Sequence, residues 1–270
     1  MKITFLGGGN MANALIGGML KQGYSASDIT VIDPGSEARR KLAETYAVNC
    51  VDAADKLPGA GDLLVLAVKP QQMKEAVVPL VGKLGQAVVV SIAAGLDLTT
   101  LARFLGGHRK IVRCMPNTPA LIGAGITGLC PLPEVSTVER EAANRLLSAV
   151  GSTVWIDDET KMDGVTALSG SGPAYVFLFI EALQQAAADL GFTPEQGRQL
   201  AIETVQGAAA LAAQSSDPAA VLRERVTSKG GTTEAALRTM ADSGVKEGII
   251  AGVKAAEARG RELGKLLGAA

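Results

Sequence analysis

The stretch KITFLGGGNMANAL, Lys2–Leu15, indicates the fold class of this chain. An apolar run leads into three glycines and then into a helical pattern, which is typical of a strand, a tight turn and a helix. Gly7, Gly9 and Ala12 occupy the small-residue positions of the dinucleotide-binding pattern G-x-G-x-x-[G/A]. Gly7 permits the sharp turn, Gly9 lets the backbone approach a pyrophosphate, and Ala12 lets helix and strand pack closely. Free N–H groups at the start of the helix would then bind the phosphates.

Similar strand-to-helix units repeat along the first 158 residues, which predicts a doubly wound α/β domain over residues 1–158. The predicted strands are Lys2–Leu6, Thr30–Asp33, Leu63–Val68, Val88–Ser91 and Lys110–Met115. The predicted helices between them are Met11–Gln22, Ser36–Tyr46, Lys74–Val81 and Thr99–Leu105. Because the strands are rich in Val, Ile and Leu with little alternation, we expect a parallel sheet that is buried on both faces. Weaker strands at Gly125–Cys130 and Thr153–Ile156 flank a helix at Thr137–Ala149, which Ser136 would cap.

The pattern changes after Asp158, where long segments rich in Ala and Leu begin. These segments predict helices at Pro173–Leu190, Thr193–Gln214, Ala219–Val226, Thr232–Ala241 and Val245–Leu267. Residues 159–270 are therefore expected to form an all-helical second domain. Its polar surface is thin for so many apolar positions, so we expect this half to bury a face against another subunit. A self-contained helical bundle is the alternative.

Composition excludes several classes of protein. The chain has 270 residues, a formal net charge of -1 and 3% aromatic residues, which argues against binding nucleic acid. No apolar run approaches the roughly 20 residues of a membrane span, and the start of the chain has no secretory signal pattern. Cys50, Cys114 and Cys130 are widely spaced and odd in number, which predicts reduced thiols, no metal site and a cytoplasmic location.

The end of the second predicted strand bears on the choice of coenzyme. Asp33 stands where a carboxylate usually binds the ribose 2′-hydroxyl of NAD and repels the 2′-phosphate of NADP. Ser36, Arg39 and Arg40 follow it and could instead receive that phosphate. The residues alone leave NADP(H) and NAD(H) open.

Other predicted strands also end in loops that should meet at one edge of the sheet, where ligands bind in open parallel sheets. Val68 leads into KPQQ, Ser91 into IAAG and Met115 into PNTPA. Small residues in the first two loops would line the cofactor, and Asn117 would lie near the nicotinamide. Lys69 either contacts a phosphate or is an exposed residue at the start of a helix.

The only histidine, His108, precedes the strand at Lys110 and so lies at the opposite edge of the sheet. Many alcohol dehydrogenases need a His, Lys or Tyr to move the hydroxyl proton. An imine nitrogen is basic and can arrive already protonated. The absence of a well-placed histidine therefore favours reduction of a C=N bond.

Two more glycine turns precede predicted helices in the second half. ALSGSGPAYVF (Ala167–Phe177) and VTSKGGTTEAAL (Val226–Leu237) both combine glycines with small hydroxylated residues. Free N–H groups at such helix starts suit an anion, whereas ordinary capping by Ser171, Thr232 or Thr233 is the simpler interpretation.

Across essentially its whole length the chain resembles the pyrroline-5-carboxylate reductase family. FLGGGNMANALIGG, LAVKPQ, VSIAAG, RCMPNTPA, LSGSGPAYVF and VTSKGGTTEAAL occur in the order and spacing of that family, and the last motif is the most specific. The resemblance implies a Rossmann domain followed by a helical dimerisation domain. It also implies that NADPH or NADH reduces 1-pyrroline-5-carboxylate to L-proline, the last step of proline biosynthesis. The implied assembly is a homodimer, often five dimers in a decamer.

The resemblance also implies functional residues. With those proposed above, the predicted cofactor-binding residues are Leu6, Gly7, Gly8, Gly9, Asn10, Met11, Asp33, Ser36, Arg39, Ala67, Val68, Lys69, Pro70, Ile92, Ala93, Ala94, Asn117 and Arg225. The predicted substrate-binding residues are Glu159, Ser171, Gly230, Gly231, Thr232 and Thr233. The amides of Gly230, Gly231 and Thr232 would hold the substrate carboxylate. Thr233 would be catalytic and would hydrogen-bond the ring nitrogen.

Two positions depart from the family pattern. Lys229 stands where proline is common, and Arg225 lies at a position near the cofactor in some relatives, where it could favour a phosphate. Two other functions remain open. A β-hydroxyacid dehydrogenase would need a catalytic lysine in the second domain, but Lys161, Lys229 and Lys246 lie in no matching motif. A dinucleotide sensor without activity is the third interpretation.

Overall fold

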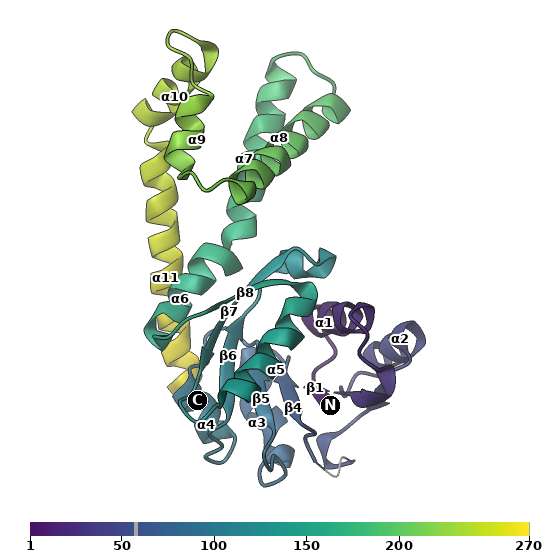
Figure 1. The fold of residues 1–270 in the computed structure, drawn as a ribbon. Helices are drawn as coiled ribbons and strands as arrows, with labels where there is room; N and C mark the ends of the chain where they lie inside the picture. The colour runs from purple at the N-terminus through teal and green to yellow at the C-terminus, as the bar shows by residue number, and fades with distance from the viewer. Residues whose placement is uncertain (57–58, 270) are drawn as a thin grey trace. The chain divides into compact units, whose positions relative to one another are not determined.

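The computed structural model describes residues 1–56 and 59–269, which form two compact units (Figure 1). The first unit comprises Met1–Ser171 and Ala256–Ala270, and the second comprises Gly172–Ala255. The last helix, α11 (Val245–Ala269), belongs in part to each unit. The domain boundary predicted after residue 158 stays a prediction, because compact units need not coincide with domains defined by sequence.

The described part of the first unit contains a sheet in the order β3-β2-β1-β4-β5-β6-β7-β8. The strands are β1 (Ile3–Leu6), β2 (Ile29–Ile32), β3 (Asn49–Val51), β4 (Leu63–Leu66), β5 (Val88–Ser91), β6 (Ile111–Met115), β7 (Gly125–Pro131) and β8 (Gly151–Trp155). Strands β1 to β6 are parallel, β7 runs antiparallel to β6, and β8 is parallel to β7. The order 3-2-1-4-5-6 is that of dinucleotide-binding domains, so the predicted fold class is confirmed.

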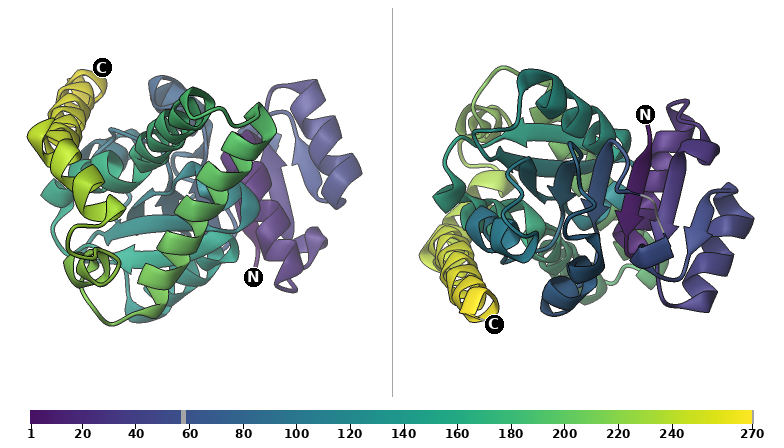
Figure 2. Two further views of the ribbon diagram at one scale, coloured as in Figure 1. Left: turned by 90° about the horizontal axis from the view of Figure 1, so that it is seen from above. Right: turned by 90° about the horizontal axis from the view of Figure 1, so that it is seen from below.

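Helices cover both faces of this sheet (Figure 2). They are α1 (Asn10–Lys21), α2 (Ser36–Tyr46), α3 (Met73–Val77), α4 (Leu98–Phe104), α5 (Thr137–Leu147) and α6 (Met162–Val165). Successive residues of a strand point to opposite faces of the sheet and pack into two separate hydrophobic cores. Val65 packs with α1 and α5, whereas Leu64 and Leu66 pack with α3 and α4. This two-sided burial explains why the strands are continuous apolar runs.

Most predicted boundaries are correct to within two residues, and the exceptions have local causes. The helix predicted at Lys74–Val81 ends at Val77 and continues as a 3₁₀ turn, Val78–Leu80, because Pro79 has no amide hydrogen. Strand β3 has only three residues and gave no apolar run to recognise. The cap predicted for α5 is confirmed. The Ser136 hydroxyl accepts from the Glu139 amide, and the Glu139 carboxylate accepts from the Ser136 amide.

The second unit is helical, as predicted. It contains α7 (Gly172–Asp189), α8 (Pro194–Gln214), α9 (Ala219–Arg225), α10 (Thr232–Asp242) and the first part of α11. Large apolar side chains are exposed along it, including Phe177 at 64% and Leu178 at 66%. The helical stretch Glu159–Asp189 is long and apolar enough to cross a membrane by length and composition. Such exposed apolar residues are equally typical of a subunit interface, which is what the sequence predicts for this half.

Candidate functional site

Backbone hydrogen bonds bring three predicted cofactor loops to one edge of the sheet. The Gly7 amide donates to the Ile32 carbonyl at 2.8 Å, and the Ala67 amide donates to the Leu6 carbonyl at 2.8 Å. The Ile92 amide donates to the Leu66 carbonyl at 3.1 Å. The loops that follow β1, β4 and β5 therefore start side by side, at the carboxyl ends of the strands.

The first glycine turn is shaped to admit a ligand at Gly9. Gly7 has φ +102°, and a Cβ built on it would lie 2.7 Å from the Ala67 carbonyl oxygen. A Cβ built on Gly9 would meet no atom within 4 Å. Gly9 is also the N-cap of α1, where no side chain caps the helix and the first turn holds no acidic residue. Open space and uncapped amides fit the pyrophosphate of a dinucleotide.

Asp33 holds this turn in place. Its carboxylate accepts the Gly8 amide at 2.8 Å through Oδ2 and the Gly35 amide at 2.8 Å through Oδ1. Arg39 Nη1 donates to the Asp33 carbonyl at 2.6 Å, while Ser36 is exposed at the start of α2. Both carboxylate oxygens thus have backbone partners, and a guanidinium lies beside the same residue.

The cofactor residues predicted after β4, β5 and β6 lie in the segments that follow those strands. Lys69 is exposed and precedes the 3₁₀ turn Pro70–Gln72, and it forms no ion pair with any described residue. In the next loop Ala93 is buried and Ala94 is exposed. Asn117 has a structural partner, because its Oδ1 accepts the Ile126 amide at 2.9 Å and fastens the loop after β6 to β7.

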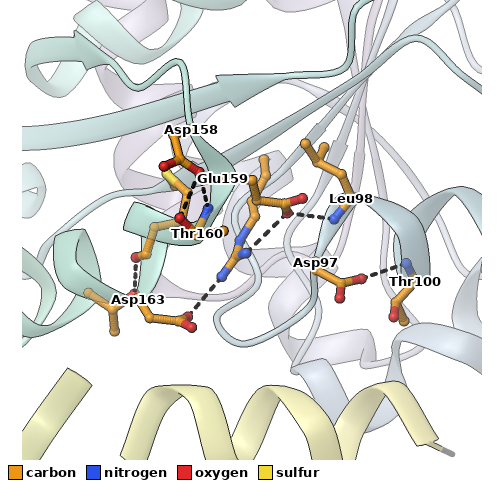
Figure 3. Close-up of polar contacts among 10 residues, drawn as sticks. Asp97, Leu98, Thr100, Asp158, Glu159, Thr160 and Asp163 are labelled. Carbon is orange, nitrogen blue, oxygen red and sulfur yellow. Dashed lines mark hydrogen bonds and ion pairs between the residues drawn. The ribbon is translucent and has the colours of Figure 1, made fainter. Parts of the chain in front are cut away.

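Glu159 lies in a cluster that the sequence prediction did not include (Figure 3). Its Oε1 accepts the Leu98 amide at 2.7 Å and Arg113 Nη1 at 3.1 Å. Arg113 also donates through Nη2 to Asp163 Oδ1 at 3.2 Å. The signal for this cluster was a charged residue inside the apolar strand IVRCM. Its carboxylate partners, 46 and 50 residues further along the chain, could not be read from that pattern.

The helix predicted at Pro173–Leu190 is present as α7 (Gly172–Asp189), but Ser171 does not provide a free helix start. Residues Thr166–Gly170 form a π-helical turn that continues α6 into α7, and the Ser171 amide donates to the Thr166 carbonyl at 2.8 Å. The amide of Ser171 is therefore already used inside a continuous helix. The proposal of Ser171 as a substrate ligand loses the free helix start on which it was based.

In the second glycine turn, in the helical unit, two of the three amides predicted to be free are bonded within the protein. Gly230 has φ +73°, and its amide donates to Glu234 Oε2 at 2.6 Å. The Gly231 amide donates to the Ser228 carbonyl at 3.0 Å. Gly231 is the N-cap of α10, and no side chain caps that helix. The first-turn amides from Thr232 onward are therefore the ones available to an anion.

The side chains of this turn remain open. The Thr233 side chain is half-buried and Thr232 is exposed, and neither hydroxyl has a hydrogen-bond partner among the described residues. Lys229 is exposed and forms no ion pair with a described residue. Arg225, also in this unit, is paired with Asp217 at 2.5 Å.

Histidine and cysteine chemistry is absent from the described carboxyl edge. The ring of His108 is half-buried, with Nε2 2.9 Å from the Ala87 carbonyl at the amino end of β5, as predicted. The three thiols are free. Burial raises the pKa of Cys130 to about 11, with a further rise from the Glu159 charge, and burial holds the pKa of Cys114 well above its usual range. Both groups stay protonated near neutral pH.

Two family models match the chain. The model described as "NADP oxidoreductase coenzyme F420-dependent" matches residues 2–95. The model described as "Pyrroline-5-carboxylate reductase dimerisation" matches residues 159–263.

Similar proteins cover nearly the whole chain. It is 44% identical to a pyrroline-5-carboxylate reductase of Pseudomonas aeruginosa, over 99% of this chain and 98% of that protein. It is 42% identical to the reductase of Pasteurella multocida, over 98% of each. The solved reductase of Coxiella burnetii superposes with a TM-score of 0.92 at 38% identity, over 97% of this chain and 98% of that one. The Plasmodium falciparum reductase, solved with NADP bound, gives 0.87 at 29% identity over 98% of each chain. The chain belongs to the pyrroline-5-carboxylate reductase family.

Proposed function

We propose that this protein reduces the C=N bond of 1-pyrroline-5-carboxylate with NADPH and forms L-proline, the last step of proline biosynthesis. The observation that carries the proposal is the pairing of two uncapped glycine turns in one chain. One has the open space at Gly9 that a dinucleotide needs, and the other presents the first-turn amides of α10 beside a free hydroxyl. Family membership over the full length of the relatives supports both assignments.

The protein's own groups would bind and orient the two reactants. The amides at the start of α1 hold the pyrophosphate, and Asp33 fixes the turn through the Gly8 amide. NADPH supplies the hydride when bound. The α10 amides from Thr232 onward hold the substrate carboxylate, and the Thr233 hydroxyl hydrogen-bonds the ring nitrogen. Because an imine nitrogen can arrive protonated, no histidine is required.

A single assay tests the function. Purified protein should oxidise NADPH when 1-pyrroline-5-carboxylate is added and should leave NADPH unchanged without it. A 3-hydroxy acid with NADP⁺ serves as the control for the dehydrogenase alternative. Absence of turnover with both NADPH and NADH would overturn the proposal.

The coenzyme preference should depend on Arg39. Since both oxygens of Asp33 already accept backbone amides, Ser36, Arg39 and Arg40 are the groups left to receive a 2′-phosphate, and Arg39 is the one that already contacts Asp33. Arg39→Ala should raise the KM for NADPH by about 10-fold, the worth of one charge-assisted hydrogen bond, and that for NADH by less than about threefold. Lys41→Ala, which removes an exposed positive charge from the same helix, is the matched control and should change neither. Equal losses with both coenzymes would show that Arg39 only supports the Asp33 backbone.

The assembly is a homo-oligomer, as a dimerisation domain requires. We propose a homodimer as its unit and a pentamer of dimers as the larger form, with the exposed apolar side chains of the helical unit covered by a second copy. Light scattering on the purified protein measures this directly. We also propose a cytoplasmic enzyme that binds neither membrane nor nucleic acid.

A further inference from the structure

The loop that follows β5 is held at its far end by an ion pair that reaches it from the neighbouring strand β6. This loop, Ile92–Asp97, leaves the sheet after Ser91 and enters α4 at Leu98. At its start, Ser91 lies directly beside Arg113 in the β5–β6 ladder. At its end, the Leu98 amide donates to Glu159 Oε1 at 2.7 Å, and the same oxygen accepts Arg113 Nη1 at 3.1 Å (Figure 3).

Arg113 is rigid enough to serve as the fixed point of this arrangement. Its side chain is only 8% exposed, and Arg113 is the central residue of β6, which lies between β5 and β7. A buried guanidinium needs carboxylate partners, and it has two, Glu159 and Asp163. Of these two, Glu159 is the one that also reaches the loop, whereas Asp163 Oδ1 accepts from Arg113.

The start of α4 depends on this contact from far away in the sequence. Asp97 is the N-cap, and its Oδ1 accepts the Thr100 amide at 2.6 Å. The Asp97 side chain does not accept from the Leu98 amide. The carboxylate of Glu159, 61 residues further along the chain, accepts the hydrogen bond of that amide. A carboxylate at this position also interacts favourably with the helix dipole. Without Glu159, the entry to α4 and the loop before it lose the contact that fixes their position relative to β6.

The loop is also closely packed against the C-terminal part of α11. Gly95 has φ +78°, and a Cβ built on Gly264 of α11 would lie 3.0 Å from the Gly95 carbonyl oxygen. Ala93 and Leu96 are buried. Because the loop is closely packed, a shift of its end at α4 would also displace its cofactor-facing residues.

We propose that Glu159 is a positioning residue for the cofactor-lining loop Ile92–Asp97 and is not a ligand of the substrate. The inference rests on the proposed function for the identity of the cofactor. It replaces the role that sequence resemblance implied for Glu159, because its Oε1 is bonded to the α4 amide and to Arg113.

NADPH binding to the purified full-length protein tests this without turnover, through the change in NADPH fluorescence on titration. Glu159→Ala should raise the Kd for NADPH about 10-fold or more, the usual cost of losing a hydrogen bond to a charged group. Asp163→Ala is the matched control. It removes the same charge from Arg113 but leaves the Leu98 amide held, so its Kd should stay within about twofold of wild type.

Two conservative variants separate position from charge. Glu159→Gln keeps an acceptor for the Leu98 amide and should restore the Kd to within about threefold of wild type. Glu159→Asp keeps the charge beside Arg113 but is one methylene shorter, so it should bind NADPH as poorly as Glu159→Ala. These two variants decide the matter even where Glu159→Ala fails to fold.

Three results would overturn the inference. An unchanged NADPH Kd in Glu159→Ala, with a raised KM for 1-pyrroline-5-carboxylate, would make Glu159 a substrate ligand. If Glu159→Ala and Asp163→Ala raise the Kd for NADPH equally, the loss of affinity comes from the missing charge beside Arg113 and not from the contact with Leu98. Wild-type NADPH affinity in Glu159→Asp would show that the loop does not depend on the reach of this side chain. A wild-type protein that binds NADPH without turning over the imine would defeat only the proposed function.

Discussion

Gly9→Val should abolish measurable NADPH binding while leaving the fold intact. Gly9 has φ −71° and ψ −173°, a backbone conformation that valine adopts, and its Cβ would point into open space. The N-cap change should cost about 1 kcal/mol, or a fall in Tm of at most about 4 °C. The branched side chain would then fill the space where the pyrophosphate must approach the backbone. We expect the Kd for NADPH to rise more than about 100-fold, a loss of about 3 kcal/mol.

Gly7→Ala is the contrasting variant, because it should damage the fold and not just the ligand site. Its Cβ would lie 2.7 Å from the Ala67 carbonyl oxygen, at a φ of +102° that L-residues rarely adopt. We expect a large fall in Tm, measured by circular dichroism, for this variant alone. Wild-type affinity for NADPH in Gly9→Val would mean that the pyrophosphate binds elsewhere, and equal Tm values for the two variants would refute the division of roles between these glycines.

The sheet could be predicted from the sequence because its strands are buried on both faces. Runs such as Leu63–Leu66 and Val88–Ser91 contain almost only apolar residues, and each of these residues packs into one of two cores. The first glycine turn was also predictable, since the steric need for Gly7 is local. Strand β3 was missed because three residues, one of them exposed, leave no pattern.

The parts of the candidate site that the sequence could not indicate depend on contacts between distant residues. The link from Glu159 to Leu98 spans 61 residues. In two places, a nearby acceptor in the protein binds an amide that the sequence had suggested was free. The π-helical turn at Thr166–Gly170 uses the Ser171 amide, and Glu234 takes the Gly230 amide that had been assigned to substrate. A glycine-rich motif predicts free amides, but it does not show which neighbouring acceptors will satisfy them first.

Thr233→Ala should lower kcat about 100-fold and leave the Kd for NADPH unchanged, because losing one preorganised hydrogen bond to the reacting centre costs about 10²–10³ in rate. Thr233 is half-buried and its hydroxyl has no partner among the described residues, so removing the hydroxyl should not destabilise α10. Its amide, which would help to hold the substrate carboxylate, remains in the alanine variant. The effect should therefore appear in kcat more than in the KM for 1-pyrroline-5-carboxylate.

Two variants isolate the hydroxyl from the turn that carries it. Thr232→Ala changes the exposed neighbour and keeps its amide, so kcat should stay within about threefold of wild type. Thr233→Ser retains a hydroxyl at the same position and should recover most of the lost rate. If Thr233→Ala turns over like wild type, the ring nitrogen must receive its hydrogen bond from water. The α10 amides would then be the whole contribution of this turn, and the turn would bind the carboxylate without taking part in the reduction. A loss shared equally by Thr232→Ala and Thr233→Ala would point instead to a general disturbance of the start of α10.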